Sequence, residues 1–328
     1  MRGLAAAVTA AVLAVVTGCA AGPGSDRPAS APAVHAATAR EAAARSVAGR
    51  AAGHGSARAG QAATCDPKAS SLAPTGPPQV TPGSFMAKIR ARGYLIAGVD
   101  QSTYHFGYLN PLDGQIEGFD IDMIRAVATA IFGSPKVEYK AISNAQRRPA
   151  IQHGTVDIVA HTMTILCSRL QQVDFSSVYF DAHQRVLVLK NSRAAGLASL
   201  GGQKVCATAG SDAVDTIASY PASPRVVLVA VPESTDCLVL LQQDQVAAIC
   251  TDDTVLSGLA AQDPFTKVVG PPLNDQPYGL AIARQHPDFV RFVNAVLARE
   301  RADGAWKASY ARWIGTPVPA PPPAQYAA

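Results

Sequence analysis

Two kinds of charged residue stand where they could hold a small zwitterion. Arg169 follows a polar stretch, and its planar guanidinium can bind a carboxylate through two parallel hydrogen bonds. Asp252 and Asp253 follow the apolar run 246–250, which is typical of a buried strand, so either carboxylate could face an ammonium group. Alternatively, Arg169 forms a surface ion pair, and either aspartate caps the helix that begins near Thr254.

Other polar residues follow expected strands and could add hydrogen bonds. Thr162 and Thr164 offer hydroxyl and backbone groups to a carboxylate. Gly210 and Ser211 lie where a strand turns into a helix, so free amides there would favour an anionic group. His161 is either a satisfied structural histidine or a donor to a ligand side-chain oxygen.

Several classes of function lack support. The chain has no Ser-His-Asp order, no cluster of metal ligands and no phosphate-binding loop. With a net charge of +4, 16% charged residues and no basic stripe, it does not resemble a nucleic-acid-binding protein. We therefore expect no catalytic residue, no metal and no cofactor.

Strands and helices are expected to alternate from about residue 94. The patterns predict strands at 94–99, 137–142, 156–160, 185–189, 204–207, 226–231, 246–250 and 279–283, and helices at 148–153, 237–243, 288–301 and 306–314, with others beginning near Asp120 and Ser211. Asp120 and Ser234 are expected to cap helices, and Gly133 to end one. Such alternation implies an α/β fold with parallel sheets covered by helices.

A weak internal repeat divides this region in two. The segments 150–158 and 240–248 each read as a helix, a turn and a buried strand, and a polar loop follows each of them. The repeat predicts two α/β lobes with ligand groups at the carboxyl ends of their strands, where open parallel sheets bind ligands.

The N-terminus predicts export. Arg2 precedes the apolar run 4–16, which is too short to span a bilayer but typical of a signal-peptide core. The run leads into Thr17-Gly18-Cys19, which resembles a bacterial lipobox whose cysteine is lipidated after cleavage. We expect 1–19 to be a lipoprotein signal peptide with the lipid at Cys19, an ordinary signal peptide being the alternative. No later stretch is long and apolar enough to span a membrane.

Two segments are expected to stay unfolded. Residues 20–84 are dominated by Ala, Gly, Ser and Pro, and residues 316–328 are rich in Pro. Neither buries enough apolar surface to offset its ordering entropy. We predict a disordered tether and a disordered tail around one folded region.

Five cysteines remain after removal of the signal peptide and lipidation of Cys19. An exported chain meets an oxidising environment, so two disulfides and one free thiol are expected. The pairs we predict are Cys65–Cys167, which would attach the end of the tether beside Arg169, and Cys206–Cys237. Cys250 is expected to be a small buried residue.

An ordered set of short segments resembles the family 3 extracellular solute-binding proteins, which bind polar amino acids for ABC importers. The set comprises Gly98-Val99-Asp100, Gly118-Phe119-Asp120-Ile121-Asp122, Met163–Arg169, Asp174-Phe175-Ser176, Val205–Ser211, Asp252-Asp253 and Tyr278-Gly279. The resemblance implies a two-lobed, type II periplasmic-binding fold, with parallel-rich sheets joined by a two-strand hinge. It places lobe 1 at 85–182 plus 278–315 and lobe 2 at 183–277.

The resemblance also implies roles for individual residues. Arg169 would bind the ligand's carboxylate, and Asp253, favoured over Asp252, its ammonium group. Asp100, Thr103 and Tyr104 would touch the ligand's side chain, although Tyr104 is equally a core residue. The family's frequent aromatic lid is absent near Asn144, which favours an acidic or amide side chain over an aromatic one.

The resulting hypothesis is a monomeric, membrane-anchored lipoprotein outside the cytoplasm that binds glutamine, asparagine, glutamate or aspartate. Its partner would be the permease of an ABC importer or, alternatively, a membrane sensor. Two other hypotheses remain. One is an enzyme on the same fold, similar to periplasmic cyclohexadienyl dehydratases, with an acid in the cleft. The other is a structural envelope lipoprotein that has lost its ligand.

Overall fold

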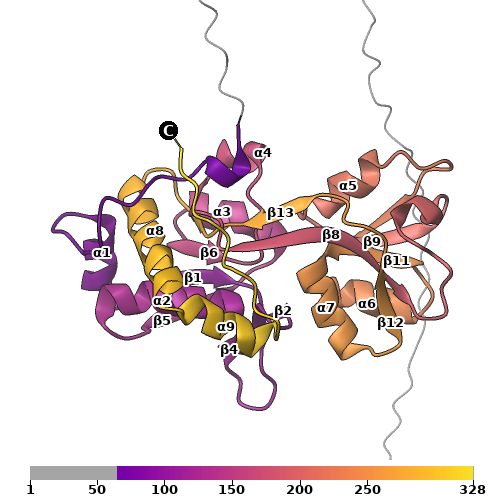
Figure 1. Ribbon diagram of the computed structural model, residues 1–328, viewed down its shortest axis with the longest axis horizontal. Coiled ribbons are helices and arrows are strands. Elements are labelled where there is room, and N and C mark those ends of the chain that lie inside the picture. The colour runs from indigo at the N-terminus through magenta and orange to yellow at the C-terminus, as the bar shows by residue number, and fades with distance from the viewer. Residues whose placement is uncertain (1–64, 328) are drawn as a thin grey trace, which may run out of the picture. The chain divides into compact units, whose positions relative to one another are not determined.

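The first sheet forms the core of one half of the molecule. In the computed structural model, which describes residues 65–327, its strands run in the order β5-β1-β6-β14-β7 (Figure 1). They are β1 (Leu95–Val99), β5 (Val137–Ala141), β6 (Ile158–Ala160), β7 (Asp174–Phe175) and β14 (Ala281–Ile282). Strand β1 pairs in parallel with β5 and β6, whereas β14 is antiparallel to its neighbours. We call this half lobe 1.

Six helices accompany the first sheet in the sequence of lobe 1. They are α1 (Phe85–Arg92), α2 (Phe119–Phe132), α3 (Arg147–Gln152), α4 (Cys167–Leu170), α8 (Pro287–Ala302) and α9 (Ala305–Trp313). Helix α2 buries Ile124, Val127 and Ile131 at helical spacing, and Gly133 ends it in a left-handed conformation, as predicted. Asp120 does not cap this helix. Gly118 precedes the helix, and Asp120 lies buried in its first turn.

The second sheet forms lobe 2. Its order is β10-β9-β11-β8-β12, with β8 (Phe180–Leu189), β9 (Lys204–Thr208), β10 (Val227–Val231), β11 (Ala248–Asp252) and β12 (Thr266–Val269). Strands β9, β10 and β11 are parallel, as the alternation predicts. The helices of lobe 2 are α5 (Ala213–Ser219), α6 (Ser234–Gln242) and α7 (Asp253–Gln262). The predicted cap Ser234 is instead the first residue of α6, and Glu233 takes the cap position.

Two antiparallel strands run between the lobes. Strand β13 (Asp275–Tyr278) pairs with the first half of β8, so that His183 faces Asp275 and Phe180 faces Tyr278. Figure 1 shows this pair connecting the two sheets. The lobe boundaries drawn from the sequence fall within the pair. The described residues, 65–327, belong to one compact unit.

Shorter elements complete the fold. A small antiparallel sheet, β2-β3-β4, contains Ser102–Thr103, Gly107–Leu109 and Ile116–Glu117. Three single-turn helices are η1 (Pro67–Ala69), η2 (Asn144–Gln146) and η3 (Leu197–Leu200). In the part of the chain described by the structure, no helix has both the length and the apolar character to cross a bilayer.

Both predicted disulfides are present. Cys65 is bonded to Cys167 at the start of α4, and Cys206 of β9 is bonded to Cys237 of α6. Cys250 is a buried free thiol in β11. Cys19, the signal peptide and residues 20–64 of the tether lie outside the described residues.

The two segments expected to be disordered differ from that expectation where they are described. Ser71 donates its hydroxyl to the Phe175 carbonyl at 2.7 Å, and its own carbonyl accepts the Ala327 amide at 2.8 Å. In the tail, the Pro322 carbonyl accepts the Arg301 guanidinium at 3.1 Å. The composition argument considered only the apolar content of these segments. It missed that polar side chains could join the two segments to lobe 1 and that their backbone groups could pair with each other.

Candidate functional site

A polar cavity lies between the lobes, at the carboxyl ends of their parallel strands. Its free volume is about 20 Å³, which is room for about one water molecule. Lobe 1 lines it with Asp100, Thr103, Asn144, Arg147, His161 and Thr162, and lobe 2 lines it with Thr208, Ser211, Asp212, Glu233, Ser234, Thr251, Asp252 and Val255. Asp100 follows β1, His161 follows β6, and Thr208 and Asp252 end β9 and β11. The predicted position of the site, at these strand ends, agrees with the cavity.

Asp100 is a fixed acceptor on the lobe 1 side. Its Oδ1 accepts the backbone amides of Gln101 and Ser102 at 2.7 and 2.8 Å, and its Oδ2 accepts the Thr103 hydroxyl at 2.5 Å. Burial opposes ionisation, but the positive charge of His161, when its ring is protonated, and these donors hold the pKa of Asp100 below its ordinary value. Asp100 is therefore a carboxylate already placed in the cavity wall.

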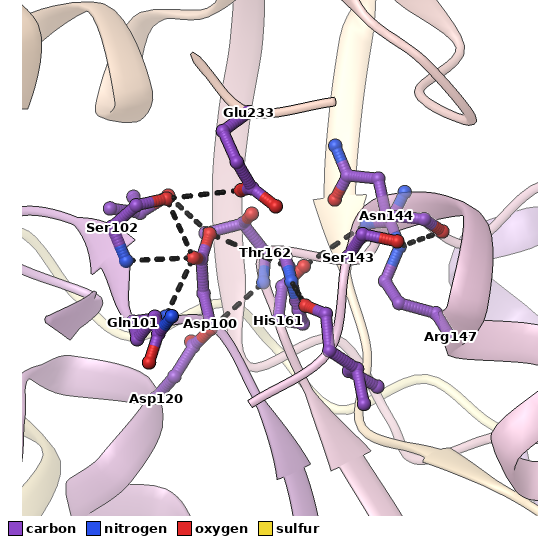
Figure 2. A network of polar contacts seen from close by, with 12 residues as sticks. Asp100, Gln101, Ser102, Asp120, Ser143, Asn144, Arg147, His161, Thr162 and Glu233 are labelled. Carbon is purple, nitrogen blue, oxygen red and sulfur yellow. Dashed lines mark hydrogen bonds and ion pairs between the residues drawn. The ribbon is translucent and has the colours of Figure 1, made fainter. Parts of the chain in front are cut away.

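Glu233 brings a second carboxylate to the same place from lobe 2. The Ser102 hydroxyl bridges the lobes, because it contacts Asp100 Oδ1 at 2.9 Å and Glu233 Oε2 at 3.3 Å (Figure 2). Burial, and then the charge of Asp100, raise the pKa of Glu233. The sequence analysis missed Glu233. The acid directly before Ser234, at the start of α6, was the available signal.

His161 donates through one ring nitrogen to the backbone, and its other ring nitrogen, Nδ1, lies 3.7 Å from Asp100 Oδ2. Its Nε2 lies 2.8 Å from the Ile142 carbonyl oxygen, so this nitrogen carries the hydrogen. Burial lowers the pKa of His161, which leaves a neutral ring whose Nδ1 is an acceptor. Among the described residues, this Nδ1 is buried and has no hydrogen-bond partner.

Arg147 is the guanidinium that lines the cavity, and the sequence analysis missed it. The residue is buried and donates to the carbonyls of Asn144, His161 and Gly210 at 3.1, 3.0 and 3.2 Å. Burial, and then the charge of Arg169, lower its pKa to about 9, so it stays charged at neutral pH. Three of its five N–H groups are used in these bonds, which leaves two for a ligand. Figure 2 shows Arg147 and Asn144 on the side of His161 opposite Asp100 and Ser102.

At the turn of Gly210 and Ser211, the Ser211 amide is used within lobe 2. Ser211 lines the cavity, but its amide donates to the Thr208 carbonyl at 3.1 Å and its hydroxyl contacts the same oxygen at 2.7 Å. Gly210 uses its carbonyl to accept Arg147 from the other lobe. The Gly210 carbonyl therefore links this turn to lobe 1.

Arg169 lies behind the cavity wall. It is buried, and its Nη1 donates to the Thr164 carbonyl at 2.8 Å. Its Nη2 lies 3.6 Å from Oδ1 of Asp212, and it is Asp212 that lines the cavity. Burial lowers the pKa of Arg169, while the nearby charges of Asp212 and Asp252 raise it.

The two adjacent aspartates point in different directions. Asp252, the last residue of β11, lines the cavity, and its Oδ2 accepts the Tyr278 hydroxyl at 2.6 Å. Burial raises its pKa to about 8, with the charge of Asp212 as the second cause. Asp253 begins α7 and is not among the residues that line the cavity. Its Oδ1 accepts the His183 amide at 3.1 Å. The geometry thus favours Asp252, the competitor, over Asp253.

Of the remaining predicted residues, two line the cavity and two do not. Thr103 and Thr162 line the cavity, and the Thr162 amide donates to Asp120 Oδ2 at 2.8 Å. Thr164 donates its hydroxyl to Gln276 and does not reach the cavity wall. The Tyr104 ring packs on His105 and Tyr108, outside the lining set.

Comparison with known proteins gives this arrangement a family. Residues 95–316 match the bacterial extracellular solute-binding proteins, family 3. The ABC transporter glutamine-binding protein GlnH of Bacillus subtilis is 34% identical over 231 residues, which are 70% of this chain and 84% of that protein. The glutamate-binding protein GluB of Corynebacterium glutamicum is 30% identical, over 68% of this chain and 79% of that protein.

The solved structures agree with the sequences. An ancestral arginine-binding protein bound to glutamine superposes with a TM-score of 0.64 at 31% identity, and covers 69% of this chain and 99% of its own. The predicted two-lobed fold is thereby confirmed. The named relatives are binding proteins and not enzymes, as expected. This chain belongs to family 3 of the bacterial extracellular solute-binding proteins and is an amino-acid-binding member of it.

Proposed function

We propose that this protein binds glutamine between its lobes, with asparagine as the next best ligand, and delivers it to the permease of an ABC importer. The observation that carries the choice is a pair of buried acceptors without partners among the described residues, Asn144 Oδ1 and His161 Nδ1. A carboxamide NH₂ group supplies two donors, whereas the carboxylate of glutamate or aspartate supplies none.

The charges of the cavity support a neutral side chain. The lining carries four acids, Asp100, Asp212, Glu233 and Asp252, and one guanidinium, Arg147. A second carboxylate on the ligand would add repulsion in a buried site. The amide oxygen can accept one of the free N–H groups of Arg147, so that both ends of the amide find partners.

The backbone of the amino acid would use the remaining groups. We assign the ammonium group to Asp252, and the carboxylate to Arg169, the cation that the sequence had indicated. The similarity to glutamine-binding proteins at 34% identity supports the same ligand class.

Calorimetric titration of the purified protein tests the choice of ligand. We expect glutamine to bind at least about tenfold more tightly than glutamate, aspartate or arginine. His161→Ala should weaken glutamine binding more than it weakens glutamate binding, while His153→Ala, at an exposed position, should change neither. The tightest binding by glutamate or arginine would refute the assignment, and so would the absence of any amino-acid binding.

Attachment to the membrane and the partner are part of the same proposal. The Thr17-Gly18-Cys19 sequence supports a lipid anchor at Cys19. Cys19→Ser should release the protein from the membrane fraction, and a retained protein would contradict the anchor. Loss of labelled glutamine uptake in a deletion strain would support import. Unchanged uptake would favour the alternative, a sensor subunit.

A further inference from the structure

Six polar residues form a closed ring that joins both lobes to the strand pair between them. From Arg169 the contacts pass through Thr164, Gln276, Asn274, Gln184 and Asp212, and Asp212 returns to Arg169. Arg169 and Thr164 belong to lobe 1, and Asp212 directly precedes α5 of lobe 2. Gln276 lies in β13 and Gln184 in β8. The ring therefore couples the position of the Asp212 carboxylate to β8 and β13, the two strands between the lobes.

Asp212 pairs with the guanidinium of Arg169, the same group that the proposed function assigns to the ligand's carboxylate. Its Oδ1 lies 3.6 Å from Arg169 Nη2, and the two side chains are only 15% and 8% exposed. Its other oxygen, Oδ2, accepts Gln184 Nε2 at 2.8 Å. Asp212 lines the cavity, whereas Arg169 does not, so the carboxylate is the member of this pair that reaches the cavity.

We infer that Asp212 is a resident competitor for the ligand's carboxylate, and that its ion pair with Arg169 holds the lobes together when the cavity is empty. This inference rests on the proposed function, because it assumes that an amino-acid carboxylate reaches Arg169. A bound carboxylate displaces Asp212 from Arg169 and leaves two anions close together in a buried site. Asp212 thereby lowers the affinity for the amino acid and stabilises the closed, empty form.

The charge of Asp212 can be removed with little change in shape. In Asp212→Asn the competition and the repulsion are both lost, so amino-acid affinity should rise about tenfold in calorimetric titration. Without ligand, the same variant should open, and small-angle scattering should show a larger radius of gyration than for the wild type. Asp212→Ser, which also removes the charge, should show the same rise in affinity and the same larger radius of gyration. Agreement between the two variants excludes an effect that is specific to the asparagine side chain.

Asp215→Asn is the matched control, because Asp215 is exposed on α5 and acts on Arg169 by its charge without contacting it as Asp212 does. It should leave affinity and scattering unchanged. Weaker binding by Asp212→Asn would mean that Asp212 holds the ammonium group, and this would overturn the inference. An unchanged radius of gyration would also overturn it. The scattering comparison needs no ligand, so it still decides whether Asp212 holds the empty lobes together if the wild type binds no amino acid and the proposed function fails.

Discussion

Tyr278 donates its hydroxyl hydrogen to Asp252 at 2.6 Å, and both side chains are buried. Tyr278 ends β13, one of the two strands between the lobes, and Asp252 ends β11 at the cavity. The same hydroxyl lies 2.7 Å from that of Thr254. The acid assigned to the ligand's ammonium group is thus held in place by the segment that would move when the lobes open.

Replacing Asp252 should abolish binding and stabilise the empty protein. Asp252→Asn removes the carboxylate that faces the ammonium group, so affinity should fall at least about 100-fold. An acid whose folded pKa is raised destabilises the fold increasingly as pH rises above its unfolded pKa. Because the folded pKa is about 8, the gain in unfolding free energy should be larger at pH 8, on the order of 2 kcal/mol, than at pH 5.

Asp253→Asn is the control for this experiment. Asp253 contacts His183 outside the cavity, so the variant should bind within about twofold of the wild type. A large loss in Asp253→Asn with a normal Asp252→Asn would restore the residue that the sequence analysis preferred.

Binding should release a proton. In the structure Asp252 has a pKa of about 8 and is protonated at neutral pH, whereas an adjacent ammonium group favours its ionised form. The unliganded state therefore binds more protons, and affinity should rise by about 50-fold from pH 6 to pH 8 and then level off. Calorimetry in two buffers of different ionisation enthalpy should show about one proton released per ligand at pH 7. A pH-independent affinity would contradict this role.

Arg169 should matter far more than its neighbour on α3. Arg169→Ala removes the buried guanidinium that donates to Thr164 and pairs with Asp212, and we expect a loss of affinity of about 100-fold. Arg148→Ala removes an arginine whose contact with Gln172 is exposed, and binding should stay within about twofold. If both variants bind alike, the ligand's carboxylate goes elsewhere, with Arg147 as the next candidate.

Gly118 should tolerate no side chain. Its φ is +134°, and a Cβ there would lie only 2.1 Å from the Phe106 carbonyl oxygen. Gly118→Ala should cost at least about 3 kcal/mol in chemical denaturation, since backbone must move. Gly114, with φ +70° and open space around it, provides the comparison, and Gly114→Ala should cost about 1 kcal/mol. Equal losses of unfolding free energy in the two variants would show that the backbone near Phe106 moves aside at little energetic cost.

Much of the fold was predictable, because it follows from local pattern. The strand patterns that became β1, β5, β9 and β11 and the helical spacing in α2 and α8 appear in the sequence itself. Cap positions were less secure. Asp120 looked like a cap but is a buried acceptor for Tyr179 and Thr162, a role set by residues distant in sequence.

The site was predictable in place but not in detail. Strand ends indicated Asp100, His161 and Asp252, whereas Arg147, Asp212 and Glu233 come from helix starts whose side-chain directions depend on how the lobes meet. Asp252 and Asp253 are adjacent, so which of them faces the cavity depends on the residue at which the strand ends. The strand ends at Asp252 and the helix begins at Asp253, so the two side chains diverge.

Cys250 lies two residues before Asp252 on β11, fully enclosed, and burial raises its pKa to about 12. Its sulfur can react with an alkylating reagent only when this strand is exposed. The rate of alkylation at this position therefore measures how often lobe 2 comes apart. Slower labelling in the presence of an amino acid would report occupancy of the site at a residue already present in the chain.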